Sequence, residues 1–190
     1  LWRRVADVGA PNVTLALEGA PLWLAEGVML LPAPCTTRRP GRDLTEWMER
    51  AETPEGALRV GLAHGPVLDF SEDGVAGGVI APDRAQRAGL DYLALGDWHG
   101  QMRLGDRCYY SGTPEPDRFK HDRPGTALVV SIAGAGATPE VTAVPTACFA
   151  WQDQPLELLA GDDGAERLDA LLPAPGARRQ TLLRVMLSGH

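Results

Sequence analysis

Two short stretches of the chain end apolar runs in residues that bind metal ions. The stretch VGLAHGPV carries His64, and the stretch YLALGDWHG carries Asp97 and His99. Imidazole nitrogens and carboxylate oxygens are donors that divalent Mn, Fe, Zn and Ni accept, and no cysteine stands in either stretch to compete. Two such ions side by side bind a phosphate group, stabilise its developing charge and lower the pKa of a bound water. The pattern therefore predicts a metal site for phosphoester hydrolysis, with His64, Asp97 and His99 as ligands.

Both motifs follow segments that we expect to be buried strands, 58–64 and 90–96, with a helix over 81–89 between them. Strands joined by a single helix are expected to be parallel neighbours, so their carboxyl ends meet at one edge of the sheet. In open α/β sheets that edge is where ligands bind. Glycines flank both motifs and let the backbone turn sharply there. The three side chains are therefore expected to converge on one cavity.

The remaining segments predict a layered α/β protein. Short apolar groups within 13–31 are typical of successive strands, and 43–52 has the spacing of an amphipathic helix, with Asp43 placed to cap it. Further strands are expected within 107–112, 125–132 and 140–145. Residues after about 150 add a short helix and a strand-like run. We expect a domain over 1–150 and the start of an accessory segment over 151–190.

Composition excludes some classes of protein. The chain has 190 residues, of which 44% are hydrophobic and 23% charged, as in globular proteins. No apolar run is long enough for a membrane helix, no secretory signal is visible, and the three cysteines form no C-x-x-C pair, so we expect a cytoplasmic protein without membrane partners. The net charge of −7 speaks against nonspecific DNA binding, which normally uses a basic face.

GLAHG followed by GDWHG resembles the last two motifs of the calcineurin-like metallophosphoesterases, in particular of the nuclease subunit of DNA double-strand-break repair complexes. The segment YYSGTPEPDRF (109–119) resembles the strand and loop that follow those motifs. The resemblance covers roughly residues 15–150, and more weakly a following segment like the start of a small C-terminal capping domain. It implies a partial αββα sandwich with mixed sheets.

The resemblance also implies a function. It implies a hydrolase, a DNA repair exonuclease that cleaves phosphodiester bonds with two divalent ions. Manganese is the first expectation, with iron, zinc or nickel as alternatives. His64 and Asp97 would hold one ion and His99 the other. DNA is the implied partner, and an ATPase of the chromosome-segregation type and a second copy of the chain stay open as further partners.

The sequence departs from the family's pattern in two ways. Asp97 stands where the family has a histidine, and the upstream motifs D-x-H, G-D-x-x-D and G-N-H-D are missing. We therefore expect the chain to be the C-terminal part of an enzyme and to be inactive alone, since the catalytic histidine would lie in the missing N-H-D motif. A small-molecule phosphodiesterase or phosphatase, and a noncatalytic scaffold module that lost its metals, remain alternatives. Arg118 could meet a substrate phosphate or pair with Asp117 or Asp122.

Overall fold

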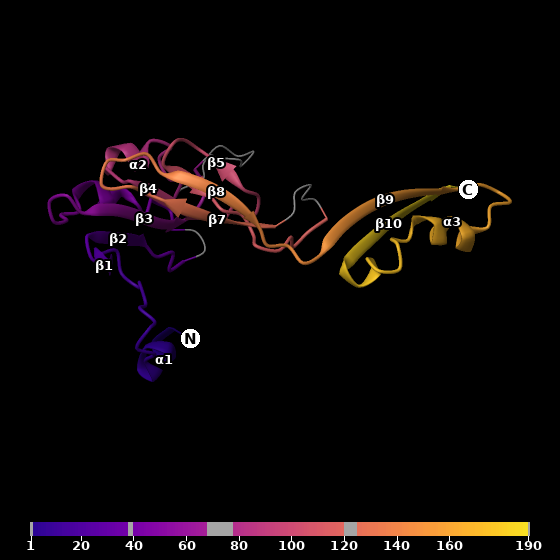
Figure 1. Ribbon diagram of the computed structural model, residues 1–190, viewed down its shortest axis with the longest axis horizontal. Helices are drawn as coiled ribbons and strands as arrows, with labels where there is room; N and C mark the ends of the chain where they lie inside the picture. The colour runs from indigo at the N-terminus through magenta and orange to yellow at the C-terminus, as the bar shows by residue number, and fades with distance from the viewer. Residues whose placement is uncertain (1, 38–39, 68–77, 120–124, 190) are drawn as a thin grey trace. The chain divides into compact units, whose positions relative to one another are not determined.

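The computed structural model describes residues 2–37, 40–67, 78–119 and 125–189 (Figure 1). The protein has mixed α/β character, with several sheets and few helices. Its elements follow in the order α1 (Trp2–Val8), β1 (Leu22–Ala25), β2 (Val28–Ala33), the 3-10 helix η1 (Glu46–Arg50), β3 (Leu58–His64), α2 (Arg84–Arg87), β4 (Tyr92–Gly96), β5 (Met102–Arg103), β6 (Cys108–Tyr110), β7 (Thr126–Ser131), β8 (Glu140–Pro145), β9 (Ala150–Leu158), α3 (Gly164–Leu171), the 3-10 helix η2 (Arg178–Gln180) and β10 (Thr181–Gly189).

The largest sheet has six strands in the order β1-β2-β3-β4-β6-β5. Strands β2, β3, β4 and β6 are parallel, while β1 and β5 pair antiparallel at the two edges. The register of β3 and β4 sets Val60 opposite Tyr92 and His64 opposite Gly96. The carboxyl ends of these two neighbouring strands are therefore level with each other.

Two smaller sheets complete the strand pairing, one of β9 and β10, which run parallel, and one of β7 and β8. Among the described residues, no helix has both the length and the apolar composition needed to cross a membrane.

The core packs against one face of the large sheet. Leu31 and Leu93 are fully buried on β2 and β4, and Met48 of η1 is fully buried against them. Close packing depends on Gly61 in β3, where an added Cβ would lie 2.7 Å from the δ-carbon of Leu90. The sheet and its covering segments thus approach each other at a position without a side chain.

A buried ion-pair network ties η1 to α2. The Arg84 side chain is only 2% exposed, and its Nη2 lies 2.8 Å from Asp43 Oδ2, while Nη1 pairs with Glu49. The Asp43 carboxylate also accepts hydrogen bonds from the backbone nitrogens of Thr45, at 2.8 Å, and Ala81, at 3.1 Å. Two segments far apart in sequence are therefore joined by one carboxylate.

The strands predicted at 58–64 and 90–96 are confirmed, the first as β3 and the second, slightly shorter, as β4. The helix predicted over 43–52 is wrong in type and extent, since only Glu46–Arg50 form a helix and it is a 3-10 helix. Asp43 does not cap it, because its carboxylate is engaged by Thr45, Ala81 and Arg84.

Contacts along the chain define two compact units. The first comprises 1–98, 102–110 and 130–140, and the second comprises 99–101, 111–129 and 141–190. The predicted domains, 1–150 and 151–190, are consecutive along the chain, whereas these units interleave. The domain assignment stays a prediction.

Candidate metal centre

Strands β3 and β4 bring two of the predicted ligands together. His64 is the last residue of β3, and Asp97 follows the last residue of β4. His64 Nε2 lies 3.6 Å from Asp97 Oδ1, and the two side chains are 59% and 47% exposed. The pair is therefore open to solvent and accessible to an ion. Both residues belong to the first compact unit.

The imidazole of His64 lies over the backbone of the neighbouring strand. A Cβ added to Gly96 would come 2.9 Å from His64 Nδ1, so only glycine leaves room for the ring in this position. The chain beyond His64 is fixed by a hydrogen bond from the Gly65 nitrogen to the Gly96 oxygen at 3.1 Å. The Tyr110 hydroxyl donates to the Gly65 oxygen at 2.6 Å. Burial raises the pKa of Tyr110 to about 12, which keeps this donor protonated.

Asp97 has an unusual backbone conformation. Among the described residues it is the only one other than glycine with a positive φ, at 108°. An L-residue in this region costs about 1–3 kcal/mol and is retained where the surrounding structure enforces it, commonly at functional sites. In this conformation the Asp97 carboxylate lies beside the His64 ring.

His99 has a different carboxylate partner. Its Nδ1 lies 2.7 Å from Oδ2 of Asp117, and the two side chains are 38% and 39% exposed. Arg118 Nε lies 3.7 Å from the same oxygen, so the predicted pairing of Arg118 with Asp117 is confirmed, while Asp122 is outside the described residues. His99 and Asp117 belong to the second compact unit.

The donor atoms of His64 and Asp97 have the spacing of two ligands that share one divalent ion. Imidazole nitrogen and carboxylate oxygen each bind such ions at about 2.0–2.2 Å, so two ligand atoms of one ion lie at most about 4.4 Å apart. The observed 3.6 Å falls within that limit. Within the part of the chain that the structure describes, no three His, Cys, Asp or Glu side chains gather around one point. The three-ligand centre of His64, Asp97 and His99 stays a prediction.

A small cavity of about 40 Å³ adjoins Asp97. Asp97, Trp98 and Tyr110 contribute to its lining, together with apolar residues. A space of this size is large enough for a water molecule and too small for an organic ligand.

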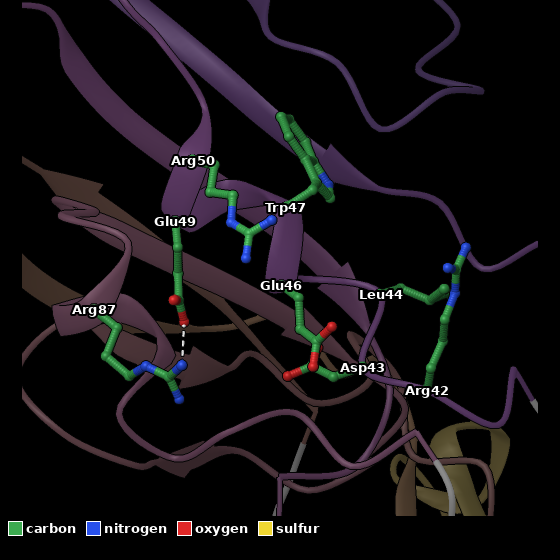
Figure 2. Close-up of a pocket in the computed structure, with 8 residues that line it drawn as sticks. All are labelled: Arg42, Asp43, Leu44, Glu46, Trp47, Glu49, Arg50 and Arg87. Carbon is green, nitrogen blue, oxygen red and sulfur yellow. Dashed lines mark ion pairs between the residues drawn. The ribbon is translucent and has the colours of Figure 1, made fainter.

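A larger polar pocket of about 460 Å³ lies in the first unit between η1 and α2 (Figure 2). Its lining alternates in charge, and Glu49 pairs across it with Arg87 Nη2 at 2.8 Å. Eight residues line it: Arg42, Asp43, Leu44, Glu46, Trp47, Glu49, Arg50 and Arg87. Three acidic and three basic side chains balance here, and Asp43 and Glu49 are also engaged by the buried Arg84. The pocket has the features of a structural ion-pair network.

The sequence pattern did not assign Asp117 to His99 or Tyr110 to the backbone beyond His64. Asp117 stands 18 positions after His99 in a loop segment, and neither spacing nor periodicity distinguishes it from other loop carboxylates. Tyr110 was recognised only as part of a strand, although its hydroxyl supports the backbone beyond His64.

The chain was compared with profiles of known protein families and with the sequences of curated proteins, and it matches none of them.

Proposed function

We propose that this chain forms part of a metal-dependent phosphoesterase of the calcineurin-like type, and that its substrate is DNA, as in a repair exonuclease. The large sheet would be one layer of the αββα sandwich of that class. The observation that carries the proposal is the pair of His64 and Asp97 at the level ends of two parallel strands, 3.6 Å apart, with Asp97 held at positive φ.

In this proposal His64 and Asp97 hold one divalent ion and His99 contributes to a second. Bound divalent ions would polarise the phosphoryl oxygens and lower the pKa of a bound water. The chain's own contribution is to hold the ligand atoms in place. Gly96 gives the His64 ring its room, and the Tyr110 hydroxyl fixes the backbone after it.

The aspartate at position 97 is compatible with the proposal. A carboxylate supplies a hard, negatively charged oxygen, which suits manganese better than a third imidazole would. Asp97 also retains its approach to His64 although both groups are half exposed. Exposed pairs of this kind contribute about 0–1 kcal/mol to stability. The backbone strain at Asp97 costs about 1–3 kcal/mol, so the pair with His64 does not offset it, and a role in binding explains why the strain is kept.

The test is metal analysis and Mn²⁺ titration of the full-length protein, followed by hydrolysis of linear double-stranded DNA and of a chromogenic phosphodiester. We expect bound metal near stoichiometry and Mn²⁺-dependent hydrolysis of both substrates. Asp97→Asn and Gly96→Ala should each weaken Mn²⁺ binding, the first by removing a ligand charge and the second by displacing His64. Asp106→Asn is the matched control, since Asp106 is a 73% exposed carboxylate paired with Arg103 in the same unit.

Two outcomes would replace the proposal. Hydrolysis of the chromogenic diester without any cleavage of DNA would indicate an enzyme for small phosphoesters, which the net charge of −7 also favours. A full-length protein that binds no Mn, Fe, Zn or Ni, and whose Asp97→Asn variant behaves like the parent, would be a noncatalytic scaffold.

A further inference from the structure

The pocket of about 460 Å³ between η1 and α2 contains charged side chains that its ion-pair network does not use. Three of the charged lining residues belong to the network around the buried Arg84. Within the ranges that the structure describes, the other three form no ion pair and no side-chain hydrogen bond, and Figure 2 draws no such contact for them. These three are Arg42, Glu46 and Arg50.

The local helix geometry explains why Glu46 and Arg50 do not pair. Residues four positions apart face each other on an α-helix and commonly form ion pairs. Both residues lie in η1, which is a 3-10 helix. Such a helix has about three residues per turn, so residues three apart align and the fourth lies about 120° further around the axis. Glu46 therefore aligns with Glu49 rather than with Arg50.

Both unpaired arginines extend from backbone that is held in place. Arg42 directly precedes Asp43, whose buried carboxylate accepts hydrogen bonds from two backbone nitrogens. Arg50 is the last residue of η1, and the Ala51 oxygen that follows it accepts a hydrogen bond from Arg59 Nη1 at 3.0 Å. Because the backbone at each arginine is already ordered, less conformational entropy is lost when the side chains bind a ligand.

The charges around the pocket favour an anion with several oxygens. With Arg84 included, four guanidinium groups surround three carboxylates, although the whole chain has a net charge of −7. One guanidinium group is enough to bind both oxygens of a carboxylate. A phosphate monoester has three free oxygens and a charge of about −1.5 to −2, so it can bind two guanidinium groups at once. The two unpaired arginines, Arg42 and Arg50, therefore fit a phosphate better than a carboxylate.

Trp47 and Leu44 give the same pocket an apolar side. Both are partly buried hydrophobic residues that pack against the core and line the pocket. Aromatic rings stack on indole rings. The volume lies within the range of about 300–1,000 Å³ that is usual for sites of small organic ligands. The lining thus combines groups for a phosphate with a wall for an aromatic ring.

We propose that this pocket binds an aromatic phosphate monoester of mononucleotide size, with Arg42 and Arg50 on the phosphate and Trp47 against the aromatic ring. A free nucleotide and the 5′-phosphate end of a nucleic-acid strand present this same chemistry. Glu46 repels the phosphate and lowers its affinity. The pocket shares no lining residue with the cavity beside Asp97, and the inference does not rest on the proposed phosphoesterase function.

The first test is titration of the full-length protein with adenosine 5′-monophosphate (AMP), adenosine and inorganic phosphate in the presence of EDTA. Tryptophan fluorescence and isothermal titration calorimetry follow binding. We expect saturable binding of AMP that changes the fluorescence of Trp47, and no such change in Trp47→Phe. Adenosine should bind at least about tenfold more weakly than AMP, because it makes no charge-assisted hydrogen bonds. Inorganic phosphate should compete with AMP.

The second test uses variants of the charged residues. Arg42→Gln and Arg50→Gln should each weaken AMP binding by about tenfold and leave adenosine binding unchanged. Glu46→Gln should tighten AMP binding, which a purely structural role of this carboxylate would not produce. Arg103→Gln is the matched control, since Arg103 is 61% exposed, pairs with Asp106 and belongs to the same unit. Urea denaturation shows whether each variant is folded.

A comparison of AMP with an oligothymidine that carries a 5′-phosphate distinguishes the two sources of the ligand. Tighter binding of the oligonucleotide identifies a strand end, and tighter binding of AMP identifies a free nucleotide. No saturable binding of AMP, equal affinity for AMP and adenosine, or equal losses in Arg50→Gln and Arg103→Gln would each overturn the inference. Because EDTA is present throughout, none of these results depends on the metal site, and the two proposals fail separately.

Discussion

Replacing Arg84 by methionine should destabilise the first unit strongly, because it removes a buried charge that pairs with two carboxylates. The Arg84 side chain is 2% exposed and is shared by Asp43 and Glu49. Removing one partner of a buried ion pair typically costs about 3–5 kcal/mol, because the remaining charge stays buried without compensation. The result therefore depends on what each carboxylate retains after the substitution.

The contacts favour the lower end of that range. Glu49 is 26% exposed and keeps Arg87 at 2.8 Å. Asp43 is 8% exposed and keeps only neutral donors, the Thr45 nitrogen and hydroxyl and the Ala81 nitrogen. One poorly compensated carboxylate remains, so we expect Arg84→Met to lower the free energy of unfolding by about 3 kcal/mol. Since whole domains are stable by about 5–15 kcal/mol, the variant should still fold.

Urea denaturation followed by circular dichroism, with hydrogen exchange of the β2 and β3 amides as a local probe, measures the loss. Arg87→Met is the matched control, because Arg87 is 50% exposed and pairs with the same Glu49. An exposed pair contributes about 0–1 kcal/mol. Equal small losses in Arg84→Met and Arg87→Met would refute the assignment of Arg84 to a buried-charge network.

The same variant has a pH signature. Burial raises the pKa of Asp43, but hydrogen bonds from Thr45, Arg84 and Ala81 outweigh burial and hold the pKa below its ordinary value of 3.8. A depressed pKa stabilises the folded state above 3.8, and that contribution is lost as the pH falls through the folded-state pKa. The stability difference between parent and Arg84→Met should therefore narrow below about pH 3.8. A constant difference down to acid unfolding would contradict the role of Asp43.

Two further substitutions test the packing of the sheet and the strain at its edge. Gly61→Ala should lower the free energy of unfolding by about 1–3 kcal/mol through overpacking, since the new Cβ would lie 2.7 Å and 2.8 Å from the δ-carbons of Leu90 and Leu93. Urea denaturation measures the loss. A loss below about 0.5 kcal/mol, the usual scatter of neutral substitutions, would mean that the two leucines move aside freely. Asp97→Gly should raise the melting temperature, because the relief of about 1–3 kcal/mol of strain exceeds glycine's entropic cost of about 0.5–1 kcal/mol. The same variant should lose the Mn²⁺ binding that Asp97 shares with His64. A lower melting temperature would show that Asp97 carries no strain.

The strands that carry the candidate site were predictable because their apolar sequence pattern agrees with their position in the middle of the sheet. Residues 58–64 and 90–96 are apolar runs ended by glycine, and parallel neighbours with ends at one level follow from the single helical segment between them. The short apolar group at 13–17 satisfied the same local pattern but forms no strand, and Val13 and Leu17 are 51% and 44% exposed. Strand propensity without a pairing partner did not produce a strand.

The pairing of His99 with Asp117 was not predictable from the spacing of the motif residues. The expected convergence of His64, Asp97 and His99 on one cavity stays a prediction. Asp97, which has a positive φ, pairs with His64, and His99 pairs with Asp117. A positive φ at a non-glycine residue is enforced by surrounding structure and has no local sequence signature. The meeting with Asp117 also requires a loop contact across 18 positions.

The polypeptide passes from one compact unit to the other after residues 98, 101, 110, 129 and 140. Because of these crossings, no single cut in the backbone releases either unit intact. Truncation after residue 150 would remove part of the second unit. A cut after residue 140 therefore divides the second unit, because 99–101 and 111–129 remain with the N-terminal fragment. A fusion or transplantation that is to keep both units whole has to carry the chain from the first unit through the second as one continuous piece.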